Sequence, residues 1–386
     1  MRFLQKAILQ GFVHLKRARG YHKALALDEF RPEKVQKVLV VSSTAIGDAL
    51  FATPGIRALR RLLPKVTLDF MVRDKVAPIF SNFPFVDNLV IYKGRYKNAL
   101  ELLSKIKRKH YDLCVVFHDS DPCPVEAAFA GGIPFIFRIG QKDEKTAHLL
   151  STRIPYDNKK HAIDQRLEVL RRIFKVALDS PDDLRMELPV AKGDVQAFRS
   201  QYLSAFCNKE GQGERCKVIA FQFSASGSYK EWPQEYFIRL GRRLLKAEKT
   251  YNILLIGGPS DKKRAKCIKK AIVQGGMENR VLNMVGDIGL AKLPAALAAT
   301  DLLVTNDTGP LHVAIAVGTR TVSLFVPTDV TSTGPIQDLH LHTAIVKPKP
   351  CTPCKGKYCK DADCMGLISV EEVFGCAVKA LCSLES

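Results

Sequence analysis

Short apolar segments alternate with polar turns and amphipathic stretches along this chain, in an order typical of alternating strands and helices. Residues 302–329 show the pattern most clearly: an apolar strand, a polar turn (305–309), a small-residue helix (310–317) and a second strand (321–326). A strand, helix and strand in this order predict a right-handed crossover in a parallel sheet. The turn then lies at the carboxyl end of a strand, where the helix amino terminus offers free N–H groups to an anion.

This polar turn supports two interpretations. Asp307 and Thr308 are suited to cap the helix, which is a purely structural role. His312 lies three residues beyond Gly309 and can share the exposed first turn of the helix with them, which favours a ligand site.

The same pattern occurs near the amino end, where a buried strand (38–42) is followed by a loop, a basic helix and a second strand (67–72). The loop holds Thr44, Gly47 and Asp48 but lacks Gly-x-Gly-x-x-Gly, so a dinucleotide fingerprint is not predicted. A carboxylate at the mouth of a strand can act as a general base. It can equally cap the helix that follows.

Further strands and helices of this kind predict two α/β domains with parallel sheets. Residues 177–215 mix prolines, glycines and charges, so we place the link between the domains inside them. The predicted organisation is an amino-terminal extension (1–37), a first Rossmann-like domain (38–190), a linker (191–215) and a second Rossmann-like domain (216–386).

Two more loops of the second domain carry polar groups at predicted strand ends. Lys230 follows a serine-rich loop and can meet a phosphate as a point charge. Asp261 follows the strand 253–256 and can contact a ribose hydroxyl. The carboxyl ends of parallel strands lie along one edge, where folds of this kind bind ligands.

Composition and charge narrow the classes of protein. The chain is 46% hydrophobic and 25% charged, as in soluble globular proteins, and we identify no bilayer-spanning run and no signal peptide. We therefore expect a cytosolic protein with reduced thiols. The net charge is +20, and residues 1–109 carry 22 Lys and Arg against 8 Asp and Glu. This asymmetry suggests an anionic partner, or it is only a solvated basic surface. We find no nucleic-acid-binding motif in the basic part, so we expect a membrane-associated substrate rather than nucleic acid.

The first 28 residues predict a basic amphipathic helix, although Gly11 and Gly20 argue against one long helix. Such a helix can lie on an anionic membrane face or pack against the first domain.

Four cysteines near the carboxyl end form a C-x2-C-x4-C-x4-C run, namely Cys351, Cys354, Cys359 and Cys364. Four soft ligands this close can form a structural zinc site, and reduced cysteines in a substrate-side loop are the alternative.

Taken together, these motifs resemble the lipopolysaccharide heptosyltransferases of glycosyltransferase family 9. The stretches that carry the resemblance are STAIGDALFATPGIRALRRLLP (43–64), YKEWPQEYF (229–237), LIGGPSDKKRA (255–265), TNDTGPLHVAIAVGTRTVSLFVPTDVTSTGPI (305–336) and the cysteine run. The pairing of Gly-Asp with Asp-Thr-Gly-x-x-His is more specific than either half. Within the resemblance, the loop 224–229 is less rich in threonine than in the family, and Pro310 replaces an apolar or small residue.

The resemblance implies a GT-B glycosyltransferase, with two Rossmann-like domains facing across a cleft. It implies inverting transfer of heptose from ADP-L-glycero-D-manno-heptose to a lipid A-linked core acceptor at the cytoplasmic surface of the inner membrane of a Gram-negative bacterium. Asp48 matches the catalytic base and Lys230 stabilises the leaving ADP, while Thr44 and Gly47 belong to the acceptor-side loop. The residues that match donor-site positions are Ser226, Asp261, Ile288, Asp307, Thr308, Gly309 and His312.

The resemblance implies no cofactor, and no Asp-x-Asp metal motif occurs at the donor site, which fits metal-independent catalysis. Two alternatives remain: a family member that uses another nucleotide sugar, and a non-catalytic protein of this fold that binds a nucleotide sugar or a polyanion.

Overall fold

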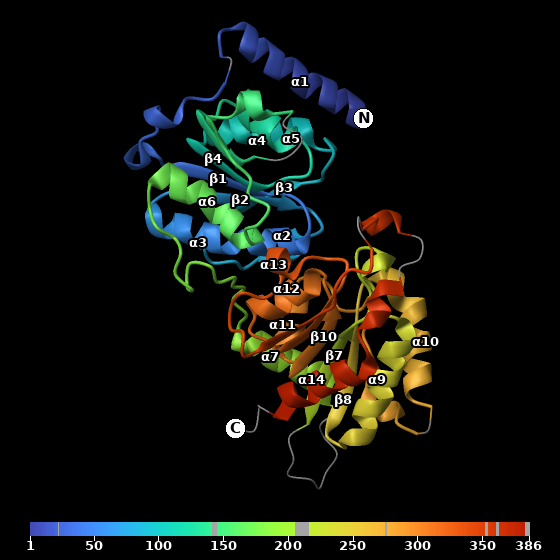
Figure 1. Ribbon diagram of the computed structural model, residues 1–386. Helices are drawn as coiled ribbons and strands as arrows, with labels where there is room; N and C mark the ends of the chain where they lie inside the picture. The colour runs from blue at the N-terminus through green and yellow to red at the C-terminus, as the bar shows by residue number, and fades with distance from the viewer. Residues whose placement is uncertain are drawn as a thin grey trace. The chain divides into compact units, whose positions relative to one another are not determined.

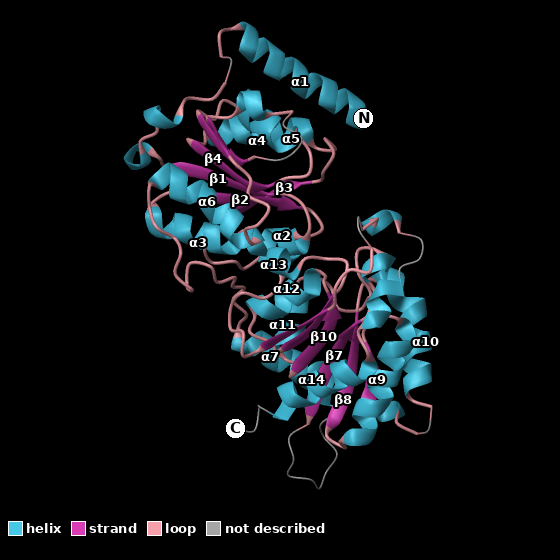
Figure 2. Cartoon of the chain, in the orientation of Figure 1, coloured by secondary structure: helices cyan, strands magenta, loops and turns pink. Residues whose placement is uncertain are grey.

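The chain forms two compact units, Met1–Glu187 and Leu188–Ser386, each with its own sheet and core (Figure 1). The computed structural model describes residues 1–21, 23–140, 145–204, 216–274, 276–351, 354–359 and 363–382. In the described residues each unit holds a parallel sheet of six strands with helices on both faces, as predicted (Figure 2).

The strand order of the first sheet is β3-β2-β1-β4-β5-β6, and every pair is parallel. Its strands are β1 (Lys37–Ser42), β2 (Thr67–Arg73), β3 (Asn88–Tyr92), β4 (Leu113–His118), β5 (Phe135–Ile139) and β6 (Thr152–Ile154). β1 pairs with β4, and a register shift near its end places Ser42 opposite His118. The two central strands therefore end beside each other.

Helices cover both faces of this sheet, so its central strands are apolar on both sides. Leu39 and Val41 belong to the core under α4 (Ala99–Lys109) and α5 (Cys123–Ala130). The helices α2 (Ile46–Phe51), α3 (Thr53–Leu62) and α6 (Ala162–Phe174) pack together on the other face. The amino-terminal helix α1 (Arg2–Ala18) packs over α4 and α5 as an additional layer (Figure 1).

The second sheet has the order β12-β11-β10-β7-β8-β9 and is also parallel. Its strands are β7 (Lys217–Gln222), β8 (Tyr251–Ile256), β9 (Val281–Asn283), β10 (Leu302–Asn306), β11 (Thr321–Phe325) and β12 (His342–Val346). One face of the sheet carries α9 (Gln234–Ala247), α10 (Lys262–Ile272) and α14 (Val370–Cys382). The other face carries three helices that pack together, α7 (Lys192–Phe198), α11 (Leu293–Ala298) and α12 (Gly309–Ala316). The short helix α13 (Val330–Thr333) follows β11.

The structure differs from the sequence-based description in the boundary between the units and in elements that were not predicted. The two units divide at Glu187, before the predicted linker 191–215. The described part of that linker forms α7 and a helical turn. Residues 205–215 lie outside the described residues. We did not predict α5, because all eight of its residues are buried and its sequence has no polar face. We did not predict the edge strands β6, which has three residues, and β12.

Two expectations from composition can be compared directly with the structure. Cys216 is disulfide-bonded, so the expectation that the thiols are reduced is wrong for this residue. In the part of the chain that the structure describes, no helix is both long enough and apolar enough to cross a membrane.

Gly55 in α3 tests the packing of helices on the first sheet. A Cβ atom at this position would lie 2.4 Å from Cζ of the buried Phe117 in β4. Gly55→Ala should therefore lower the free energy of unfolding by about 1–3 kcal/mol, against the usual gain from replacing a helical glycine.

The matched control is Gly11→Ala in α1, where an added Cβ meets no atom within 4 Å and the expected change is a gain of about 0.5–1 kcal/mol. Urea unfolding followed by circular dichroism measures both. Equal stabilisation by the two substitutions would show that α3 does not need the close approach to β4.

Candidate active site

In the first unit, Asp48 lies at the carboxyl edge of the sheet, between the ends of β1 and β4. It occupies the first turn of α2, and its backbone carbonyl accepts a hydrogen bond from Ser42 Oγ at 3.0 Å. Thr44 Oγ1 lies 2.7 Å from Asp48 Oδ2 and 2.9 Å from His118 Nδ1. The loop after β1 therefore bridges a carboxylate on its own helix and an imidazole at the end of the neighbouring strand.

Arg166 reaches the same carboxylate from α6. Its Nη2 lies 3.1 Å from Asp48 Oδ1, and its Nη1 donates to the carbonyl of Ala162 at 2.6 Å. The guanidinium also lies 5.4 Å from the centre of the Phe51 ring. The Arg166 side chain is buried, whereas that of Asp48 is 27% exposed. Arg166 can thus hold the carboxylate of Asp48 from the interior of the unit, while the carboxylate stays accessible at the surface.

This arrangement keeps Asp48 ionised. Burial alone would raise the Asp48 pKa, but the charge of His118 when it is protonated, the charge of Arg166 and the hydrogen bond from Thr44 outweigh this effect and lower the pKa below its usual value. Burial lowers the pKa of His118, and Arg166 lowers it further, against the opposing effect of Asp48. His118 is therefore mostly neutral near pH 7, and at that pH Arg166 is the positively charged group beside the Asp48 carboxylate.

The same contacts define the protonation of the imidazole. A hydroxyl has one proton, so Thr44 can donate to Asp48 only if it accepts from His118. We infer that neutral His118 carries its proton on Nδ1 and leaves Nε2 as an acceptor.

In the second unit, the edge carries a cation and a buried carboxylate at the ends of β7 and β10. Lys230 Nζ lies 3.3 Å from Asp307 Oδ2, and His312 Nε2 lies 3.8 Å from Asp307 Oδ1. Asp307 directly follows β10, and His312 belongs to the first turns of α12. The structure thus brings together three of the residues that the sequence pointed to.

Hydrogen bonds hold the loop that carries Lys230. Asn306 Oδ1 accepts from the Trp232 backbone N–H at 2.9 Å, and Asn306 Nδ2 donates to the carbonyl of Phe223 at 3.0 Å. Arg264 and Glu231 form two contacts of 2.8 and 3.2 Å. Both ends of the serine-rich loop are therefore tied to neighbouring elements, which limits the positions open to Lys230.

The remaining predicted donor residues occupy different surroundings along this edge. Asp261 Oδ2 accepts from Ser224 Oγ at 2.7 Å, whereas Ser226 is exposed. Thr308 is the N-cap residue of α12, and its side chain accepts no capping hydrogen bond from any described residue. Gly309 begins α12, and Ile288 is half-buried after β9. On the first unit, Gly47 is buried in α2 beside Asp48.

The four cysteines of the carboxyl-terminal run line one cavity of about 360 Å³, together with Asp363 and Tyr229. Burial raises the pKa of Cys364, and the nearby Cys354, Cys359 and Cys351 raise it further. Among the described residues, no three His, Cys, Asp or Glu side chains converge as a metal ion would require.

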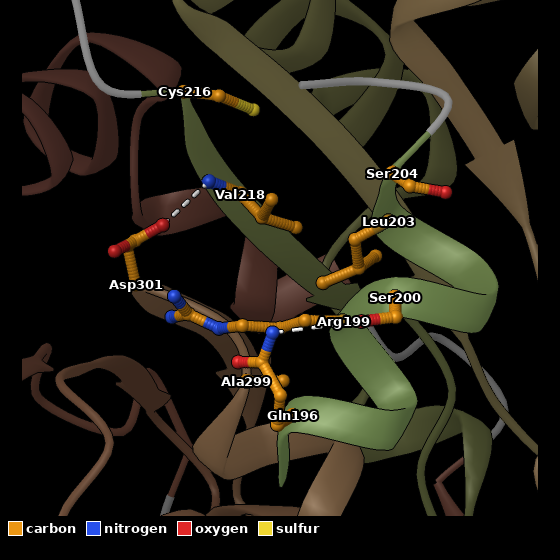
Figure 3. Close-up of a pocket in the computed structure, with 9 residues that line it drawn as sticks. All are labelled: Gln196, Arg199, Ser200, Leu203, Ser204, Cys216, Val218, Ala299 and Asp301. Atoms are coloured by element: carbon orange, nitrogen blue, oxygen red, sulfur yellow. Dashed lines mark hydrogen bonds between the residues drawn. The ribbon is translucent and has the colours of Figure 1, made fainter. Parts of the chain in front are cut away.

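A second cavity of about 570 Å³ lies at the opposite, amino-terminal edge of the second sheet (Figure 3). Its lining includes Arg199, Val218 and Asp301, and Asp301 accepts a hydrogen bond from the Val218 backbone N–H at 2.7 Å. Because none of the predicted site residues lines it, we do not include it in the candidate active site.

Sequence reasoning missed His118 and Arg166. His118 is the last residue of an apolar strand that neighbours β1, so the sheet order would have pointed to it. Arg166 lies among the apolar residues of α6, three positions after Ile163 and four before Leu170, and a charged residue on a buried helix face was the available signal.

Each unit is Rossmann-like, with a parallel sheet; a carboxylate lies at the carboxyl edge of the first sheet, and a lysine lies beside a helix amino terminus at that of the second. Two such units have the architecture of the GT-B fold. The model of glycosyltransferase family 9 (heptosyltransferase) matches residues 99–364, and the chain belongs to this family of transferase enzymes.

Individual relatives agree with this assignment. The chain is 24% identical over 348 residues to lipooligosaccharide heptosyltransferase 2 of Campylobacter jejuni, covering 87% of this chain and 96% of the relative. The solved structure of Escherichia coli ADP-heptose LPS heptosyltransferase II has a TM-score of 0.72 and 21% identity over 91% of this chain and all of that one. E. coli heptosyltransferase WaaC with ADP-2-deoxy-2-fluoro heptose has a TM-score of 0.62 and 16% identity, covering 89% and 99%.

Replacing Arg166 tests the electrostatics of the carboxylate. Arg166→Met removes the nearby guanidinium charge, so the Asp48 pKa should rise. In the wild type, the lowered pKa contributes stability that is complete above the unfolded value of about 3.9 and is lost as pH falls through the folded value. In the variant the folded value should lie closer to the unfolded one, so this contribution should be smaller and its loss should be complete at a higher pH. Carbon-13 NMR of the aspartate carboxyls measures the pKa, with Asp48→Asn to assign the signal.

The matched control is Arg172→Met, on the same helix, where Arg172 pairs with Glu168 at 2.7 Å. It should leave the Asp48 titration unchanged. An unchanged titration in Arg166→Met as well would show that Thr44 and His118 alone keep Asp48 ionised.

Proposed function

We propose that this enzyme transfers heptose from ADP-L-glycero-D-manno-heptose to the lipid A-linked inner core of lipopolysaccharide, with inversion at the anomeric carbon. Membership of family 9 supports a heptosyltransferase, and the names of the relatives supply the donor and the acceptor class. The observation that carries the proposal is Asp48, an ionised and partly exposed carboxylate held at the edge of the first sheet.

In the proposed reaction, an acceptor hydroxyl oxygen attacks the anomeric carbon of the donor. The bond from that carbon to the phosphate oxygen breaks, and ADP leaves with the electron pair. Asp48 takes the proton of the attacking hydroxyl. Arg166 and Thr44 keep one orientation of the carboxylate, so they act as positioning residues.

The leaving ADP gains negative charge, which the second unit is equipped to stabilise. An ammonium group has three protons, so Lys230 can contact a phosphate oxygen while it keeps Asp307. The amino terminus of α12 at Thr308 and Gly309 adds backbone N–H donors, and His312 keeps Asp307 in place. We assign Ser226 to the phosphate side, Asp261 to the ribose and Ile288 to the adenine.

The acceptor side of the proposal rests on charge. The basic first unit suits a phosphorylated, lipid-linked acceptor, and Thr44 and Gly47 shape the loop beside the base. We propose peripheral action at the cytoplasmic face of the inner membrane, without nucleic acid as a partner and without a catalytic cofactor.

Transfer from ADP-heptose to a panel of truncated, Kdo-containing lipid A acceptors, with EDTA present, tests the function directly. We expect product with one acceptor. ADP binding without product from any acceptor would favour another donor sugar or a binding protein.

Asp48→Ala should lower turnover by about 10²–10⁴-fold, because the proton acceptor is lost, while ADP affinity by calorimetry stays near the wild-type value. Lys230→Ala should lower turnover too, but unlike Asp48→Ala it should also weaken ADP binding.

The control for both variants is Asp179→Ala, which removes a 71% exposed carboxylate and should leave turnover and affinity unchanged. Near-wild-type turnover in Asp48→Ala would show that the base is another group.

The cysteine run carries a separate proposal, a structural zinc on Cys351, Cys354, Cys359 and Cys364. The four thiols line one cavity, and zinc would draw them together and hold them as thiolates. Plasma mass spectrometry of protein purified without chelator should find about one zinc per chain, and none in Cys354→Ser/Cys364→Ser. A metal-free wild type would favour reduced cysteines in a substrate-side loop.

A further inference from the structure

Helix α1 exposes large apolar side chains although one of its faces is already buried. Of the thirteen large hydrophobic side chains that are exposed in the described part of the chain, eight lie in residues 1–25. Those on the helix and at its start are Met1, Phe3, Leu4, Ile8, Phe12 and Leu15. Leu4, Ile8, Phe12 and Leu15 follow each other at intervals of three or four residues, so they form one exposed row along the helix.

A neighbouring face of α1 is fixed to the first unit. Leu9 and Val13 are buried in the core that α4 and α5 cover. Gln5 Nε2 donates to the carbonyl of Lys97 at 2.9 Å, and Lys16 Nζ donates to the carbonyl of Phe129 at 2.8 Å. The exposed row is therefore presented by a helix that is already ordered, so a partner need not pay the cost of folding it.

The basic residues around the row indicate which kind of partner it fits. Residues 1–27 contain six Lys and Arg and no Asp or Glu. The last turn of α4 adds Lys107, Arg108 and Lys109, and Lys107 Nζ lies 4.5 Å from the centre of the Phe12 ring. An apolar row bordered by basic groups fits an anionic bilayer surface, where apolar side chains enter the acyl boundary and cations meet the headgroups. A second copy of the chain would oppose this surface with equal positive charge.

We propose that the exposed row of α1 docks this protein on an anionic membrane surface, with the helix lying in the plane of the interface. Packing against the domain and binding a membrane, the two roles that the sequence left open for this helix, then belong to two faces of one helix. The proposal does not depend on the sugar that the enzyme transfers, and binding can be measured without any substrate.

Co-sedimentation of the full chain with vesicles tests the proposal. The wild type should bind vesicles of phosphatidylcholine with phosphatidylglycerol, bind less to phosphatidylcholine alone, and dissociate as salt concentration rises. Phe3→Ser/Leu4→Ser/Leu15→Ser removes two side chains of the row, Leu4 and Leu15, which are 63% and 57% exposed, together with Phe3 at the start of the helix, which is 76% exposed. Its partition onto the anionic vesicles should fall at least about tenfold with an unchanged melting temperature.

Two further variants complete the design. Leu339→Ser, which changes a leucine that is 65% exposed in the second unit, should bind like the wild type. Arg19→Gln/Lys23→Gln should weaken binding to anionic vesicles and leave binding to neutral ones unchanged. Equal binding of the wild type to both vesicles, or full binding by the triple variant, would overturn the proposal. The proposal would also be overturned if the wild type did not bind vesicles but formed a dimer, and the triple variant alone were monomeric.

Discussion

The parallel pairing of β1 with β4 is the constraint on which the candidate site of the first unit depends. Parallel strands end on one edge, and the register shift near Ser42 brings the last residue of β4 level with the loop that leaves β1. Thr44 can therefore contact both Asp48 and His118. A one-residue slip would turn the side chains of a strand to the other face and separate the imidazole from the loop. The apolar residues that fix the register thus also fix the geometry of the carboxylate.

The sequence revealed the fold because its signals are local. Buried parallel strands are apolar runs, and the crossover rule converts their order along the chain into a sheet. The strand predicted at 67–72 is β2 (Thr67–Arg73), one residue longer than expected. The helix α5 was not, because a helix buried on every side has no amphipathic period to detect. Short edge strands such as β6 have too few residues for a pattern.

Only part of the candidate site could be predicted from the sequence, because only some of its residues are marked by a local pattern. Asp48, Lys230 and Asp307 each follow a recognisable strand, so their place at a carboxyl edge can be derived without knowing their neighbours. Arg166 lies 118 positions from Asp48 in the chain, and their contact depends on how α6 packs. A charge on an apolar helix face shows that a partner is needed, because an isolated buried guanidinium is costly. The sequence does not say which carboxylate supplies it.

The carboxylates Asp48 of the first unit and Asp307 of the second have different environments, and the difference fits the different roles proposed for them. Asp307 is buried between Lys230 and His312, so it holds a cation in place and is poorly accessible. Asp48 is bound to a buried arginine on one side and stays 27% exposed on the other. A group that accepts a proton from a substrate must be ionised and reachable at the same time. Burying the partner arginine while leaving the carboxylate at the surface meets both conditions for the proposed base, since the charge is stabilised from the buried side and the other side stays exposed.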